Sequence, residues 1–434
     1  RSIFMLSSFR RHLLPKPMLG RVGSTVQVSE FDKPTDVVTH CPSIETGFPF
    51  HLDAFLYEHP PDLTKATECH DAFRKMIHNI CGARVWTVRE ILSGVPLDKL
   101  RNFLVDFSSI HFCISPGSQS QEVKHKEKKE YIKYSLSNLS ADELVDLILL
   151  HPSLTFDVDK STSRFTYRKI PLSPLANLTF TRDQQITTAK GVVIGRFGAI
   201  QRAPENDLMS IVWPQIGVNP IGRIKNPGKL EGGDFIILGK HTSMMGVGLR
   251  SNFYAAQQLM NEDLLGTDRF IVVEDKVDCN QQRMHLDTFF NVLDDKLCVC
   301  VDTIADDDPK YIRIAHEFVK SEKGYVEKRA IPFGQWLKDE KFTVIKSSFK
   351  QQEDYFINLL HLGRDSKGKN HVLAINPEVE KVAAEYGFNG EVHYLDFSPI
   401  TCMYGGAHCA SQVLRAPGRS EERRVGKECR SRWS

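Results

Sequence analysis

Apolar positions follow helical spacing in some stretches and extended runs in others, and the two alternate along the chain. The first folded segment begins near Val26, where VQV and DVVTHCP favour extended structure. Helical spacing then links Phe73, Met76, Ile77 and Ile80. The apolar run ARVWTV follows Gly82, and a glycine there readily takes the left-handed conformation that closes a helix. The pattern predicts a helix that ends near Gly82 and a strand directly behind it.

From Pro171 onward, short apolar runs come in pairs that are joined by turn-forming residues. The predicted turns lie at Lys190-Gly191, at Gly239 and at Asp294-Asp295. HVLAINPEV reads as one further strand, and helical patterns such as SNFYAAQQLM lie between the pairs. Strand pairs that alternate with single helices predict an α/β protein built from a repeated ββαβ unit.

The stretch between Leu92 and Lys169 has a different composition, and we predict a helical insertion there. EVKHKEKKEY is strongly charged and compatible with a helix, and we interpret it as a solvated helix face or loop. In LSADELVDLILLHP, Ser140 and Glu143 have the spacing of a capping box before an apolar run. The insertion is therefore expected over about residues 92–169.

The bulk composition narrows the function classes. Of 434 residues, 41% are apolar and 25% are charged, and the net charge is +2, so no strong general attraction to nucleic acid or to an anionic membrane is expected. No apolar run approaches the roughly 20 residues of a membrane-spanning helix. Ten cysteines without Cys-x-x-Cys pairs indicate a reducing compartment and mostly buried thiols.

Both ends of the sequence differ from the expected domain. Residues 5–25 are rich in basic, serine and apolar residues, and no acidic residue precedes Glu30. This composition suits a mitochondrial-type transit peptide, and the alternative is a disordered basic segment of a cytoplasmic protein. Residues 419–434 resemble the translation of a sequencing adapter. We therefore expect the folded domain to span residues 26–418.

Acidic residues, histidines and a cysteine collect where predicted strands begin or end. They are Asp183 in FTRD, Glu231 and Asp234 in LEGGD, His285 and Asp287 in MHLDT, and His408 and Cys409 in GGAHC. On a strand, residues two apart face the same side, so His285 and Asp287 could reach one pocket. The alternative is a polar strand edge in water. Gly232 and Gly233 after Glu231 permit a tight turn and the close approach of a ligand.

Cys409 has three possible roles on this evidence. Beside a histidine it could act as a nucleophile in covalent catalysis. It could instead bind a metal ion together with His285, Asp287 or His408, or it could be a small buried thiol. Arg202 and Arg250 could pair with a carboxylate. Carboxylates at one end of a pocket and arginines at the other would complement a zwitterion with a cationic tail. The residues alone thus favour a cysteine hydrolase or transferase.

Four motifs, in order and at suitable separations, resemble the arginine deiminase family: NLTFTRD (177–183), LEGGD (230–234), HLDT (285–288) and GGAHC (405–409). The resemblance covers roughly residues 26–418. It implies the pentein fold, a five-bladed α/β propeller of ββαβ units with pseudo-fivefold symmetry. It also implies hydrolysis of L-arginine to L-citrulline and ammonia without metal or organic cofactor, and a homo-oligomeric assembly.

The resemblance also implies a role for each residue. Cys409 would attack the guanidinium carbon and form an S-alkylthiouronium intermediate. His285 would act as acid and then as base, supported by Glu231, while Asp183 and Asp287 would hold the guanidinium nitrogens. The α-carboxylate would bind to Asn177, Arg202 and Arg250, with Phe180 along the aliphatic stem.

Tyr404 departs from the family pattern, because bacterial members often carry an arginine there, and this puts the gate of the site in doubt. GGAHC is also similar to agmatine deiminase and to other guanidine-modifying penteins, including amidinotransferases. Arg202 and Arg250 favour a substrate with a free carboxylate, hence arginine over agmatine. A metallohydrolase and a pentein that only binds are the remaining alternatives.

Overall fold

The computed structural model describes residues 20–47, 52–107, 109–113, 130, 133–159, 164–169 and 172–415. Most of the predicted leader at residues 5–25 and all of the adapter-like residues 419–434 lie outside these ranges. So does most of the charged run EVKHKEKKEY. Within the described ranges, no helix combines the length and the apolar character that crossing a membrane requires.

Five of the six sheets that the described residues form share one strand order. In each, the first strand pairs antiparallel with the second, and the second pairs parallel with the third. The sheets are β6 (Gln185–Thr187), β7 (Val192–Ile194) and β8 (Gly222–Arg223); β9 (Phe235–Gly239), β10 (Thr242–Val247) and β11 (Arg269–Glu274); β12 (Phe290–Asp294), β13 (Leu297–Val301) and β16 (Thr343–Ser347); β17 (Leu360–Arg364), β18 (Asn370–Ala374) and β19 (Gly390–Tyr394); and β20 (Gln412–Arg415), β1 (Pro34–Thr39) and β2 (Arg84–Thr87).

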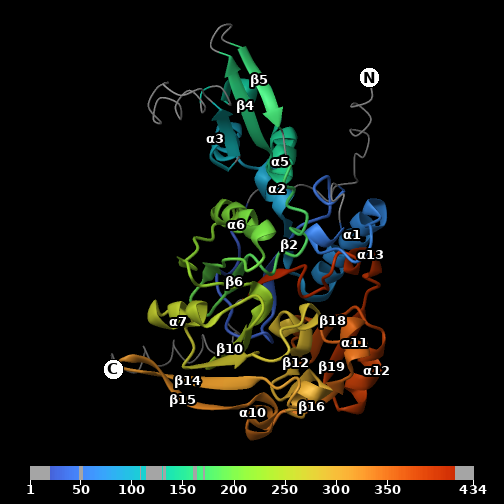
Figure 1. Ribbon diagram of the computed structural model, residues 1–434. Helices are drawn as coiled ribbons and strands as arrows, with labels where there is room; N and C mark the ends of the chain where they lie inside the picture. The colour runs from blue at the N-terminus through green and yellow to red at the C-terminus, as the bar shows by residue number, and fades with distance from the viewer. Residues whose placement is uncertain are drawn as a thin grey trace, which may run out of the picture.

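These five sheets, with the segments between their strands, are called units below. The last unit joins the two ends of the domain, since β20 pairs with β1, and Figure 1 shows the red strand running beside the blue one. The β9–β10–β11 sheet is extended by β14 (Ile314–Ser321) and β15 (Gly324–Pro332). The predicted turns at Lys190-Gly191, Gly239 and Asp294-Asp295 each join an antiparallel pair, which confirms the pattern read from the sequence.

Helices connect or flank the strands. They are α1 (Leu63–Cys81), α2 (Val88–Ser93), α3 (Leu97–Phe107), α5 (Ala141–Leu150), α6 (Ala203–Gln215), α7 (Phe253–Asn261), α8 (Leu286–Phe289), α9 (Asp302–Ala305), α10 (Phe333–Asp339), α11 (Phe349–Glu353), α12 (Glu378–Glu385) and α13 (Ser398–Thr401). α1 ends as predicted, because Gly82 has φ 68° and its N–H donates to the His78 carbonyl. Phe73 and Ile77 of α1 are fully buried, as their spacing predicts.

The predicted helical insertion is mixed rather than helical. It holds α3 and α5, but also a sixth sheet of β3 (Ser109–Cys113), β4 (Ser153–Asp159) and β5 (Arg164–Lys169), which projects from the body in Figure 1. The segments SLTFDVD and RFTYRK are rich in β-branched and aromatic residues, which favours strands over helices. The capping box at the start of α5 is confirmed: Ser140 and Glu143 each accept a hydrogen bond from the other's backbone N–H.

The apolar core lies between the strands of the units and the helices outside them. Its largest cluster packs strands β12 and β13 against α9 and α10, and it includes the buried rings of Phe290, Phe333 and Trp336. Cys298 and Cys300 of β13 lie in the same cluster and are fully buried. Inert cysteines are therefore packed as small apolar side chains, as the sequence predicts.

Candidate active site

Each unit contributes to one pocket from the segment just before its first strand. Asp183 precedes β6, Glu231 precedes the short 3-10 turn Gly232–Asp234 that leads into β9, and Asp287 lies in α8 before β12. Asn358 precedes β17, and Cys409 precedes β20. Because the five units share one strand order, the same place in each unit brings these five side chains together.

The two glycines after Glu231 allow this convergence, but what approaches them is the protein itself. A Cβ on Gly232 would lie 2.0 Å from the Arg182 carbonyl oxygen, and a Cβ on Gly233 would lie 2.6 Å from His285 Nδ1. Real side chains do not tolerate such contacts, so both positions need glycine. The close approach that the structure shows involves His285 and the neighbouring backbone, and the approach of a ligand stays a prediction.

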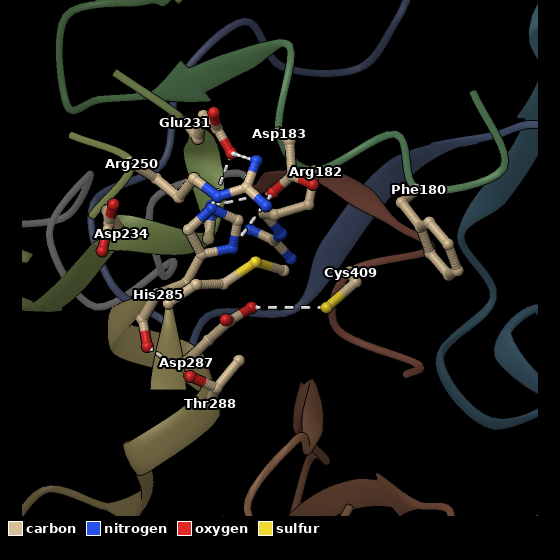
Figure 2. A network of polar contacts seen from close by, with 12 residues as sticks. Phe180, Arg182, Asp183, Glu231, Asp234, Arg250, His285, Asp287, Thr288 and Cys409 are labelled. Atoms are coloured by element: carbon tan, nitrogen blue, oxygen red, sulfur yellow. Dashed lines mark hydrogen bonds and ion pairs between the residues drawn. The ribbon is translucent and has the colours of Figure 1, made fainter. Parts of the chain in front are cut away.

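His285 lies between two carboxylates. Its Nε2 is 2.8 Å from Glu231 Oε2, and its Nδ1 is 3.8 Å from Asp183 Oδ1 (Figure 2). Burial alone would lower the pKa of His285, but Asp183 and Glu231 outweigh it and raise the pKa to about 9. Burial opposes ionisation of Glu231 as well, yet the bond from His285 and the nearby arginines lower the pKa of Glu231 to about 2. His285 is therefore a protonated acid at neutral pH.

Cys409 is buried and faces Asp287. Its Sγ lies 3.8 Å from Asp287 Oδ2, and Figure 2 shows the sulfur pointing toward that carboxylate. Asn358 Nδ2 donates to the same sulfur at 3.3 Å, while Asn358 Oδ1 accepts from the His408 backbone N–H at 3.0 Å. Burial, Asp287 and Asp183 all raise the pKa of the Cys409 thiol well above its usual value. The thiol is therefore protonated at neutral pH in this state.

Asp287 has one oxygen engaged and one available. Its Oδ2 is 2.7 Å from His408 Nδ1, whereas its Oδ1 is buried and has no hydrogen-bond partner among the described residues. The bond to His408 and the nearby cations outweigh burial and lower the pKa of Asp287. The available oxygen is an acceptor suited to an N–H donor of a ligand.

The strand predicted through His285 and Asp287 is wrong. His285 caps the N-terminus of α8, and Asp287 lies inside that helix. Asp234 fixes this arrangement, because its Oδ1 accepts from the Leu286 N–H at 2.9 Å. A helical turn that begins directly after His285 replaces the alternation of a strand, and both side chains still reach the site.

Of the two predicted carboxylate-binding arginines, Arg202 is held closely by acids, whereas Arg250 bonds to an amide. Arg202 Nη1 donates to Asp183 Oδ2 at 2.6 Å, and its Nη2 donates to Glu205 Oε2 at 2.9 Å. Burial disfavours the charge of Arg202, but these two carboxylates outweigh it and raise its pKa. Arg250 Nη2 donates to Gln281 Oε1 at 3.0 Å, and its Nη1 is 3.8 Å from Glu231. In this state Arg202 takes an oxygen of Asp183 that was predicted to face a guanidinium.

The pocket itself is closed tightly around these groups. It is lined by Leu56, Asn177, Phe180, Asp183, Arg202, Arg250, Met284, His285, Tyr404 and Cys409. Seven of these ten residues are members of the predicted site, and Glu231 and Asp287 lie behind the lining. The free space holds about one water molecule, so side chains must move before a larger ligand enters.

Tyr404 and Phe180 form part of the wall. Tyr404 has φ 72°, and its hydroxyl donates to Gln282 Oε1 at 2.6 Å. The ring of Phe180 is buried against Gly405, where a Cβ would lie 2.3 Å from the ring. Phe180 lies across Cys409 from the group of His285, Glu231 and Asp183 in Figure 2. Asn177 is buried, and its carbonyl accepts from Arg202.

Sequence reasoning missed Asn358, and it gave His408 no role beyond a possible metal ligand. The signal for Asn358 was its place in NLLHLGR, directly before a strand that begins a unit. The metal alternative for Cys409 has no geometric support in the described chain. The triads of close potential ligands found there are Cys41–His70–Asp71 and His371–Glu391–His393.

The fold is mixed α/β, and solved structures of pentein-fold proteins are similar to it. The amidinotransferase SxtG of Microseira wollei has a similar fold, with a TM-score of 0.50 and 12% identity over 91% of this chain and 98% of that chain. The N-terminal domain of ArgZ, a cyanobacterial arginine dihydrolase, gives a TM-score of 0.50 and 11% identity over 88% of this chain and 98% of that chain.

The chain belongs to the arginine deiminase family, whose model matches residues 53–415. Among curated relatives, arginine deiminase of Staphylococcus haemolyticus is 27% identical over 276 residues, which is 59% of this chain and 63% of that protein. Arginine deiminase of Staphylococcus aureus is 25% identical over 58% of this chain and 62% of that protein. The chain thus spans less than two thirds of the length of these relatives.

Proposed function

We propose that this protein hydrolyses L-arginine to L-citrulline and ammonia. The observation that carries the proposal is that Cys409, His285 and Asp183 line one pocket, while Glu231 contacts His285 and Asp287 faces Cys409. Membership of the arginine deiminase family supports it. The reaction needs a nucleophile, a proton donor and anions that hold a planar cation, and these residues can supply all three.

In the first step the substrate guanidinium binds between Asp183 and Asp287, with one N–H toward the available Asp287 Oδ1. The cation lowers the cost of ionising Cys409, whose thiol is otherwise held protonated by burial and by the two carboxylates. The thiol proton passes to solvent, and the released ammonia takes up one proton there to become ammonium. The thiolate attacks the guanidinium carbon and forms a C–S bond. The C–N bond to the departing nitrogen breaks, and protonated His285 gives that nitrogen its proton.

In the second step His285, now neutral, takes a proton from water. The water oxygen bonds to the thiouronium carbon, and the C–S bond breaks. The remaining proton of the added hydroxyl passes to the sulfur, so that citrulline leaves with its carbonyl and Cys409 regains its thiol. Glu231 holds His285 through the 2.8 Å contact at Nε2, so Nδ1, which has no hydrogen-bond partner among the described residues, is the ring nitrogen left to exchange protons in both steps. Two acidic neighbours keep the imidazolium stable enough to form again after each turnover.

The other end of arginine is assigned to Arg250, Arg202 and Asn177, with Phe180 along the aliphatic stem. All four line the pocket. Arg202 must release Asp183 before the substrate guanidinium binds there, and the substrate carboxylate would offer it a new partner. Before this exchange the Arg202 side chain occupies the place beside Asp183 where the substrate guanidinium would bind, which explains the small free space of the pocket.

A second candidate is deimination of agmatine, which lacks the carboxylate. It is favoured by the present pairing of Arg202 with Glu205 and Asp183, which neutralises that arginine inside the protein. Among the described residues Arg250 has no such close ionic partner, since its Nη1 lies 3.8 Å from Glu231 Oε2. A carboxylate-bearing substrate therefore stays the first choice. Transfer of the amidino group to an amine is the other guanidine chemistry to be tested.

The finer architecture belongs to this proposal too. Five sheets of one strand order that each place a residue at a common pocket are what a pseudo-fivefold propeller would produce. We also infer a homo-oligomer. The compartment depends on whether residues 5–25 are a presequence, with cytoplasm as the alternative to a mitochondrial-type organelle.

The test is an incubation of the full chain with L-arginine and, separately, with agmatine, in the presence of a chelator. Equal amounts of citrulline and ammonia from arginine, absent from a folded Cys409→Ala variant, are expected. Turnover of agmatine alone would show that agmatine, and not arginine, is the substrate. Appearance of a new guanidino compound when an amine is added would replace hydrolysis by transfer. No turnover of either substrate by the folded protein would contradict the proposed activity.

A further inference from the structure

A triad of ligand-type side chains lies on the β17–β18–β19 sheet, outside the pocket described above. His371 is on β18, while Glu391 and His393 are on the neighbouring strand β19. In the parallel register His371 is opposite Glu391, and His393 is the next residue on the same face. Nothing in the proposed reaction uses these residues.

Three atoms of the triad form a compact triangle. His371 Nδ1 is 3.0 Å from His393 Nε2, and Glu391 Oε2 lies 3.7 Å from the first nitrogen and 3.9 Å from the second. A point equidistant from all three atoms of such a triangle is about 2.1 Å from each, which is the length of a zinc–ligand bond, about 2.0–2.2 Å. The ligand atoms thus lie close to the separations that one metal ion requires, and a bound ion would replace the hydrogen bond between the two rings with a small widening of their separation.

From this we propose that His371, His393 and Glu391 bind a divalent transition-metal ion of the zinc type. Imidazole and carboxylate are ligands that zinc and its neighbours in the periodic table accept, and three protein ligands leave a position for water. The side chains of His371, His393 and Glu391 are 16%, 24% and 49% exposed, so an ion can reach them from solvent.

Two neighbours position the ligands. Asp365 Oδ2 is 3.8 Å from His371 Nε2, the ring nitrogen that faces away from the triangle, and can orient that ring in the way carboxylates orient metal-bound histidines. Lys369 Nζ is 2.7 Å from Glu391 Oε1 and leaves Oε2 turned to the histidines. Asp365 offsets the charge of Lys369, so the site retains the single negative charge of Glu391.

Binding would join β18 to β19, which is the outer strand of its sheet. It would not involve the active-site thiol. A metal ion held here would therefore raise the stability of the folded chain by linkage, whatever its effect on turnover.

The test is a calorimetric titration of the full chain with Zn²⁺, in a Cys409→Ser background that removes the active-site thiol. One ion per chain is expected. His393→Ala and Glu391→Gln should each weaken binding by more than about 100-fold, and Asp365→Asn by about 10-fold. Each variant is first checked for an unchanged unfolding temperature without metal, and Zn²⁺ should raise that temperature only where the triad is intact.

The matched control is His316→Ala. His316 also has two carboxylate neighbours, but Glu327 contacts its Nδ1 at 2.8 Å and Glu274 contacts its Nε2 at 3.1 Å. Carboxylates on opposite ring nitrogens cannot share one ion with that ring, so the control should bind Zn²⁺ as the parent does.

Cobalt separates this site from the other triad, Cys41–His70–Asp71. Bound Co²⁺ should show visible ligand-field bands without a thiolate charge-transfer band. A thiolate band, an affinity unchanged by His393→Ala, or no binding of Zn²⁺ would each overturn the proposal.

Discussion

The pocket and the strands behind it hold the same kinds of buried side chains in opposite electrostatic surroundings. His285, at the start of α8, is 1% exposed and His361, in β17, is 4% exposed. Carboxylates of Asp183 and Glu231 raise the pKa of His285 to about 9 against the effect of burial. Burial and the cation of Arg415 lower the pKa of His361 to about 3. Burial is shared, so the charge of the neighbours decides what each histidine can do.

The cysteines differ in the same two regions. Cys409 faces the pocket beside Asp287 and Asn358, whereas Cys300 lies in β13 within the apolar core. Burial is the first cause that raises the pKa of both thiols. A raised thiol pKa therefore does not distinguish a nucleophile from a core cysteine. What distinguishes Cys409 is the neighbouring carboxylates, which would attract a cation.

Alanine substitution should affect catalysis very differently at these two cysteines. Cys409→Ala should lower kcat with arginine by at least about 10⁴-fold, because the covalent step is lost. Cys300→Ala should keep kcat within a few-fold and lower the free energy of unfolding by about 1 kcal/mol through a small cavity. Steady-state kinetics and urea unfolding measure both. Equal activity losses in the two variants would break the comparison.

The two histidines should differ next. His285→Gln is expected to lower kcat by about 10²- to 10⁴-fold, since a proton donor and acceptor is removed. In the parent enzyme, kcat/KM should fall as pH rises through about 9, where free His285 loses its proton. His361→Gln should keep that decline. A profile in the parent that stays flat to pH 10 would show that protonated His285 is not the required form.

Stability should respond to pH in opposite directions at these histidines. The raised pKa of His285 gives a contribution that is complete below the unfolded value of about 6.5 and is lost as pH rises through about 9. The depressed pKa of His361 gives a contribution that is present above about 6.5 and is lost as pH falls toward about 3. Urea unfolding of each variant across pH should show the alkaline slope reduced by His285→Gln and the acid slope reduced by His361→Gln.

Local signals in the sequence were enough to predict several strand pairs, and the resemblance to arginine deiminase added the residues of the predicted site. The turns at Gly239 and Asp294-Asp295, the end of α1 at Gly82 and the capping box at Ser140 depend on a few neighbouring residues, and all are present. Seven predicted site residues line one pocket. Such features need only local chemistry or a shared place in a repeated unit.

Pairings between distant segments could not be predicted in this way. Arg202 looked available for a ligand, but a sequence does not show that Asp183 and Glu205 meet it first. The alternation across MHLDT favoured a strand. The Leu286 N–H instead donates a hydrogen bond to Asp234, and this bond supports a helical turn. In the sheet of β3, β4 and β5, β3 ends at Cys113 and β4 begins at Ser153, so their pairing leaves no local signal. β4 and β5 are close in sequence, and their β-branched and aromatic residues were overlooked beside the helical pattern of the neighbouring segments.

Two buried asparagines, Asn358 beside Cys409 and Asn370 in β18, should differ in the same way but by a smaller factor. Asn358→Ala should lower kcat by about 10- to 100-fold, because the sulfur loses a donor and the His408 N–H loses its acceptor. Asn370, in β18, is equally buried and bonds to Arg364, so Asn370→Ala should cost stability but not rate. The reactivity of Cys409 toward iodoacetamide gives a second measurement. A rate loss in Asn358→Ala with unchanged thiol reactivity would indicate a structural role alone.

At the pocket wall, loss of the Tyr404 hydroxyl should change the kinetics only slightly. Tyr404→Phe removes the 2.6 Å bond to Gln282 but keeps the ring, so KM for arginine should change by about 2- to 5-fold while kcat stays nearly constant. Tyr325→Phe, in β15, should change neither. If Tyr404 instead supports the chemistry, kcat would fall and KM would not. That outcome would show that Tyr404 takes part in the reaction together with the charged groups of the pocket. Only the buried residues of the strands would then lack a role in the chemistry.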